Sequence, residues 1–95
     1  MPSFHLIADV SSDAPDQIRP VVAQLFPTGI VETPGGFHIE AELEGDSARD
    51  LNRAVLTALR QAEKRTRLRA AWTTGGTTER FFDYVSKGSR PAERL

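Results

Sequence analysis

The sequence contains no cysteine, few aromatic residues and no long apolar stretch. Without cysteine, the chain cannot form disulfide bonds, thiolate nucleophiles or the common structural zinc sites, so a hydrophobic core must stabilise the fold by itself. A membrane helix needs about 18 consecutive apolar residues, and the N-terminal residues lack the basic and apolar regions of a signal peptide. We therefore expect a cytoplasmic protein that does not bind a membrane.

The motifs of common catalytic sites are also missing. The chain has no Gly-x-Ser-x-Gly motif and no supporting pattern of residues around its two histidines. The segment 73–78 is rich in threonine and glycine, but it lacks the lysine of a phosphate-binding loop, and a hairpin turn explains it better. Enzymatic activity stays open on these grounds, but the sequence favours a non-catalytic protein without a cofactor.

Two histidines and two carboxylates, on strands that are expected to be neighbours, form the one candidate metal site. Imidazole and carboxylate groups are ligands that suit a divalent metal ion. Alternating polar residues on the solvated face of a sheet explain the same pattern, and we expect no metal there. The residues are His5, Asp9, His38 and Glu40.

The size and the charge pattern of the chain are more informative. It has 95 residues, 39% hydrophobic and 26% charged, which is typical of one soluble globular domain. We expect residues 1–85 to form this domain and residues 86–95 to form a flexible tail. Residues 1–50 contain nine acidic and two basic side chains, whereas residues 51–95 contain four acidic and ten basic ones. The fold decides whether these charges are also separated in space.

The first half of the chain predicts a strand and then a helix. Residues 4–10 alternate between apolar and polar side chains, as in a strand. Residues that can cap a helix then precede Pro15, and apolar side chains recur at helical spacing as far as Phe26. Because proline removes a hydrogen bond from a helix interior, Pro20 predicts either a late start near Asp16 or a kink.

A hairpin and a second helix are expected next. The segment 29–45 predicts a hairpin with its turn at 33–36 and a strictly alternating second strand. Asp46 or Ser47 is expected to cap the second helix. Leu56 is expected to be exposed, because it lies among the basic residues of that helix. The predicted apolar face consists of Leu51, Ala54, Val55, Ala58, Leu59 and Ala62, and the opposite basic stripe of Arg49, Arg53, Arg60, Lys64 and Arg67.

The end of the chain predicts one further strand at 67–74, and residues 77–87 fit either a strand or a short helix. The whole order predicts an α+β, ferredoxin-like split βαβ fold, a two-layer sandwich of the form βαββαβ, to which residues 77–87 add an extra strand or helix. Both helices would cover one face of the sheet. The other face is expected to be acidic, with His38, Glu40, Glu42 and Glu44 joined by His5, Ile7 and Asp9.

These observations favour a non-catalytic module that binds RNA or another polyanion. Several cations on one surface release counterions when they contact phosphates. We expect nucleic acid to contact the second helix, the last hairpin or the tail rather than the sheet, because acidic side chains on the sheet would repel phosphates. The predicted contacts are Arg53, Arg60, Lys64, Arg67 and Arg69.

Two other functions stay open. The chain could associate with itself or with another protein, through its acidic sheet, a basic helix or sheet edges, with Leu56 and an outward aromatic residue as apolar anchors. If residues 77–87 form a strand, Phe81 and Phe82 must face opposite ways, so that one is a candidate for a subunit contact or a stacking platform. A regulatory domain for a small ligand is the third possibility, and it rests on the fold alone.

Several short motifs resemble a small archaeal family of single-domain RNA-binding proteins with a ribosomal-protein-like fold. They are the capping region before Pro15, the sequence Leu25-Phe26-Pro27 at the end of the first helix, Leu59-Arg60-Gln61, and Thr77-Thr78-x-x-Phe81. The similarity extends from about residue 4 to about residue 85. It implies the same fold class and RNA as the ligand, and it assigns no binding residue.

Overall fold

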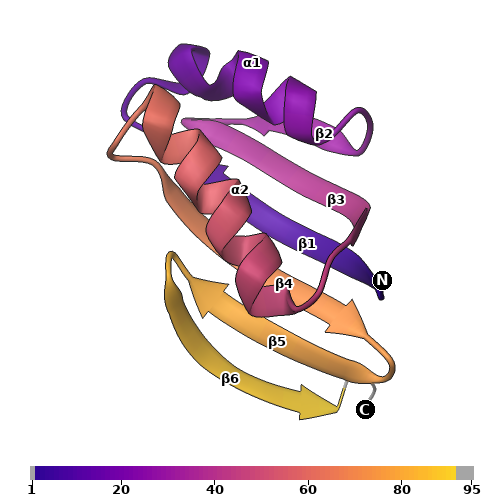
Figure 1. Ribbon diagram of the computed structural model, residues 1–95. Helices are drawn as coiled ribbons and strands as arrows, with labels where there is room; N and C mark the ends of the chain where they lie inside the picture. Colours follow the sequence, from indigo (N-terminus) through magenta and orange to yellow (C-terminus); the bar gives the residue numbers. More distant parts are fainter. Residues whose placement is uncertain (1, 92–95) are drawn as a thin grey trace.

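The computed structural model describes residues 2–91 and has two helices on one face of a six-stranded antiparallel sheet (Figure 1). The strand order is β2-β3-β1-β4-β5-β6, so β1 lies inside the sheet, between β3 and β4. The elements are β1 (Ser3–Ser11), α1 (Pro15–Leu25), β2 (Ile30–Thr33), β3 (Gly36–Glu44), α2 (Ala48–Ala62), β4 (Arg67–Thr74), β5 (Thr77–Phe82) and β6 (Val85–Pro91).

The predicted α+β class is confirmed, but the number of strands differs from the predicted βαββαβ unit. The first six elements follow the expected order, and β5 and β6 extend the sheet beyond β4 (Figure 1). Residues 77–87, for which strand and helix were both open, contribute to these two strands. Residues 86–91 were expected in a flexible tail and instead belong to β6, which pairs with β5. The rest of that predicted tail lies outside the described residues.

The core lies between the helices and one face of the sheet. Alternate residues of β1, β3 and β4 are buried there, as period-two patterning predicts. Apolar side chains of α1 and α2 cover them. The fully buried large side chains include Leu6, Ile18, Phe26, Ile39, Leu56, Leu59, Leu68 and Trp72.

The helix α1 begins at Pro15, where the missing N–H group of proline costs no intrahelical hydrogen bond. It therefore starts before the predicted late start, and it contains Pro20. Ile18 and Val22 are its buried residues, one turn apart on the face that covers the sheet.

No helix in the described part of the chain is long and apolar enough to span a membrane.

The helix α2 confirms the cap prediction and corrects the predicted faces. The Ser47 side chain accepts a hydrogen bond from the backbone N–H of Asp50, at 3.1 Å. Leu56, expected to be exposed, has 0% exposure, whereas Ala54, expected in the core, is exposed. Asn52 and Thr57, which neighbour Leu56 on the helix, are hydrogen-bonded to the turn after β5. This turn therefore lies against the side of α2 that a four-stranded sheet would leave uncovered.

Candidate binding surface on the open sheet face

No element within residues 2–91 packs on the sheet face opposite the helices, and we call this face the open face. Strand register places its side chains in rows across the strands. In the central row Ile7 pairs with Glu40 on one side and with Ala71 on the other, and Ala71 pairs with Arg80. These four residues are therefore in line from β3 to β5.

The part of the open face on β3 and β1 is acidic, and we call it the acidic half. Its histidines are hydrogen-bonded to its carboxylates: His38 Nδ1 lies 2.8 Å from Asp9 and Nε2 lies 3.2 Å from Glu40. The contacts with Asp9 and then with Glu40 raise the pKa of His38 above its ordinary value. Its members are His5, Asp9, His38, Glu40, Glu42 and Glu44.

The part of the open face on β4, β5 and β6 is basic, and we call it the basic half. Its centre is the ring of Phe82, whose exposure is 46%. The Arg69 guanidinium lies 4.9 Å from the ring centroid, and Lys87 Nζ lies 5.3 Å from it. Within the described residues, no carboxylate forms an ion pair with any cation of this half. The cations are Arg67, Arg69, Arg80 and Lys87.

The expectation of a wholly acidic open face is therefore wrong. It considered only β1 and β3, but the strand order places β4, β5 and β6 next to them and adds four cations to the same surface. Ile7, with 43% exposure, lies at the boundary between the halves. It lines an open hollow of about 340 Å³ together with Asp9, Arg69, Ala71, Arg80 and Phe82.

The five predicted contact residues do not form one surface. Arg67 and Arg69 lie on the open face, where they face Ser11 and Asp9 of β1 in the register. Arg53 is exposed on α2, in the other layer of the fold. Lys64 follows the end of α2 at Ala62 and so does not continue the basic stripe of the helix.

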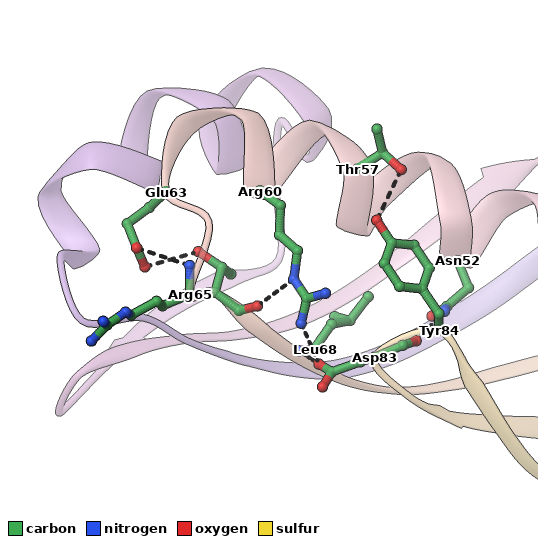
Figure 2. Close-up of polar contacts among 9 residues, drawn as sticks. Asn52, Thr57, Arg60, Glu63, Arg65, Leu68, Asp83 and Tyr84 are labelled. Carbon is green, nitrogen blue, oxygen red and sulfur yellow. Dashed lines mark hydrogen bonds and ion pairs between the residues drawn. The ribbon is translucent and has the colours of Figure 1, made fainter.

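Arg60 is occupied by contacts within the protein (Figure 2). Its Nε donates a hydrogen bond to the Thr66 carbonyl at 2.8 Å, and its Nη2 lies 3.4 Å from Asp83 Oδ1. Its guanidinium also lies 5.3 Å from the centroid of the Tyr84 ring. Its Nε and Nη2 groups are therefore engaged within the protein, where they link the last turn of α2 to the start of β4 and to the turn after β5.

A second hollow, of about 470 Å³, lies at the corner between α2 and β4. It has both signs of charge, because Asp83 pairs with Arg60 and Asp13 lies 3.3 Å from Arg65. These pairs reduce its attraction for a polyanion. Its lining residues are Asp13, Arg60, Lys64, Arg65, Arg67 and Asp83.

Nearby, Glu63 stabilises the turn between α2 and β4. It accepts a hydrogen bond from the Ser12 hydroxyl at 2.6 Å. It accepts another from the backbone N–H of Arg65 at 2.9 Å, which Figure 2 shows. These two bonds, first that from Ser12, lower the pKa of Glu63.

The turn after Phe82 is held by four residues that we call the turn anchor: Asn52, Arg60, Leu68 and Asp83 (Figure 2). Asn52 Nδ2 donates to the Asp83 carbonyl at 2.7 Å, and the Leu68 backbone N–H donates to Asp83 Oδ1 at 2.8 Å. Asp83 has a φ of 57°, in the left-handed region that aspartate tolerates in turns. The anchor thus fixes the backbone immediately after the exposed ring.

The predicted contact residues did not include Arg80, Phe82 or Lys87, although the last hairpin was expected to meet nucleic acid and one of its two phenylalanines was a candidate stacking platform. The alternation of Arg80 and Phe82 around a buried Phe81 was the available signal, because a strand must point them to the same face. For the candidate metal site weighed in the sequence, residues 2–91 contain no cluster of three histidine or carboxylate side chains that could hold an ion. Comparisons with protein-family models, curated proteins and solved structures find no match to this chain.

Proposed function

We propose that the protein is a non-catalytic module that binds single-stranded RNA through the basic half of its open face. The observation that carries this proposal is the half-exposed Phe82 ring, which lies on the surface of a sheet between Arg69 and Lys87. Proteins that bind single strands stack bases on such rings and place cations along the phosphates. The resemblance to archaeal RNA-binding proteins favours the same ligand.

The acidic half limits the path that a bound strand can follow. Asp9 lies on β1, which adjoins the basic half, and Glu40 lies on β3, one strand further away. Both carboxylates repel phosphates. The RNA strand therefore runs over β4, β5 and β6.

We also infer that β1 to β4 form a ferredoxin-like unit together with the two helices. The β5–β6 hairpin then adds most of the binding surface to this unit. We further infer that the protein acts in the cytoplasm.

Binding is tested by fluorescence anisotropy with a labelled oligouridine. If the four cations of the basic half contact phosphates, the logarithm of affinity falls with a slope of about −3 against the logarithm of salt concentration. Affinity then falls about 50-fold between about 50 and 200 mM salt. Replacing one cation, in Arg80→Ala, should make this slope shallower by about 0.7.

The contribution of the ring is tested with Phe82→Leu, which keeps an apolar side chain and removes the stacking surface. Loss of stacking on one base costs about 1–3 kcal/mol, so affinity should fall about 5- to 150-fold. Arg53→Ala is the matched control, since it removes an exposed cation from the other layer and should leave affinity nearly unchanged. Absence of binding at about 50 mM salt, or an Arg53 effect as large as that of Arg80, would contradict the proposal.

A further inference from the structure

The open face has a second property, which is that its charge pattern is complementary to itself. The central row reads Glu40, Ile7, Ala71, Arg80, with an acid at one end, a base at the other and apolar side chains between them. If the same row of a second copy lies over this one in the opposite order, each charge faces a residue of opposite charge and each apolar residue faces another apolar residue.

The neighbouring row has the same property. Asp9 and Arg69 pair in register at its centre, on β1 and β4. Val31 and Val85 lie at its two ends, on β2 and β6, and their exposures are 60% and 57%. The complete row reads Val31, His38, Asp9, Arg69, Phe82, Val85. Its reversal places Asp9 opposite Arg69 and the two valines opposite each other, and it stacks the imidazole of His38 over the ring of Phe82.

We propose that two copies of the chain pair face to face through their open faces, about a twofold axis that is parallel to the strands and passes between β1 and β4. This axis places β1 of one copy over β4 of the other, and β3 over β5. Glu40 then faces the partner's Arg80, and Ile7 faces the partner's Ala71. A twofold axis perpendicular to the strands would place β3 over β3, with carboxylates facing carboxylates, so the charges select the first arrangement.

Exposed apolar side chains provide the contact area for this pairing. Among the residues whose side chains the structure describes, five large hydrophobic ones are exposed, and all except Tyr84 belong to the open face. Sheets that pack face to face lie about 10 Å apart with strands rotated by about 30°. This rotation displaces the outer strands most, so the contacts near the axis, Ile7 with Ala71 and Asp9 with Arg69, retain the closest alignment.

Arg80 and Glu40 provide a test by charge reversal. Wild-type protein is expected to be a dimer in light scattering at about 50 mM salt, whereas Glu40→Arg and Arg80→Glu, each alone, are expected to be monomers. An equal mixture of the two variants should regain the dimer, because both contacts across the twofold axis then join opposite charges. Arg53→Glu, on the exposed side of α2, is the control and should leave the wild-type dimer intact.

Circular dichroism of each variant shows whether it is folded, and because residues 40 and 80 are exposed, we expect the fold to be retained. Two results would overturn the pairing: a monomeric wild-type protein at about 100 µM and low salt, or a mixture of the two variants that stays monomeric.

Pairing and RNA binding use the same basic half, so each should exclude the other; this consequence rests on the proposed function. Glu40→Arg should then bind oligouridine several-fold more tightly than wild type, since it removes both a repulsive carboxylate and the competing partner. Arg80→Glu should lose the pairing and should bind oligouridine more weakly than Glu40→Arg does. The two proposals fail separately: absence of RNA binding to all variants overturns the proposed function, whereas the light-scattering results above overturn the pairing without any RNA present.

Discussion

Asn52 links the core of the protein to the turn that carries the proposed binding surface. Its side chain is 1% exposed, donates to the Asp83 carbonyl at 2.7 Å and accepts from Trp72 Nε1 at 3.2 Å. Asn52→Ala removes both bonds and leaves the indole N–H of Trp72 buried without an acceptor. The substitution therefore tests the turn anchor and the core together.

The expected loss of stability follows from these two contacts. A buried donor left without a partner costs about 1–3 kcal/mol, and a lost neutral hydrogen bond costs about 1 kcal/mol. We therefore expect Asn52→Ala to lower the free energy of unfolding by about 2–4 kcal/mol. Proteins of this length have a total stability of about 5–14 kcal/mol, so the variant stays folded but unfolds at a clearly lower urea concentration.

The assay is urea unfolding followed by circular dichroism in a double-mutant cycle with Trp72→Phe. Phenylalanine has no indole N–H, so Asn52→Ala should cost at least about 1 kcal/mol less in that background. Tyr84→Phe is the mild control, because it removes only an exposed hydrogen bond to Thr57. The reasoning is refuted if Asn52→Ala costs under about 1 kcal/mol, or if its cost is the same with and without the indole.

Three other substitutions test separate parts of the structure. The pKa of His38 is raised in the folded protein by its contacts with Asp9 and Glu40. These contacts therefore stabilise the fold fully below the ordinary histidine pKa of about 6.5, and the stabilisation is lost as pH rises through the raised pKa. Wild-type protein should thus lose stability between about pH 5.5 and 8.5, and His38→Gln should lose less in urea unfolding over the same range. Ser12→Ala should raise the pKa of Glu63 in an NMR titration, because the hydroxyl is the main cause of its lowered value. Leu56→Ala should lower the free energy of unfolding in urea by about 2–5 kcal/mol, whereas the same substitution of an exposed leucine would change it little.

Local patterns predicted the elements that have strong local signals. The alternation in β3 and the Ser47 cap of α2 each depend on neighbours within a few residues, and the structure confirms both. The strand β6 has a weak signal, because Lys87, Gly88 and Pro91 are poor strand formers. It forms because β5 offers it an unpaired edge, and no local pattern reveals such an edge.

The candidate site could not be predicted for a different reason. The sequence separates acidic from basic residues along the chain, but only the strand order shows that both meet on one face. Similarly, the end of α2 at Ala62, without a glycine or proline to mark it, moves Lys64 and Arg67 out of the predicted helical stripe. The first error concerns where the strands lie relative to one another and the second concerns where a helix ends, and residue spacing encodes neither.

The central place of β1 also affects how the protein is made. This strand leaves the ribosome before the other five strands of the sheet, yet it pairs on one side with β3 and on the other with β4, which ends at Thr74. Until β4 has been synthesised, one edge of β1 remains unpaired, and such an edge promotes aggregation. The sheet therefore stays incomplete until β4 has been made, and a chain truncated before β4 would expose one edge of β1 to other proteins.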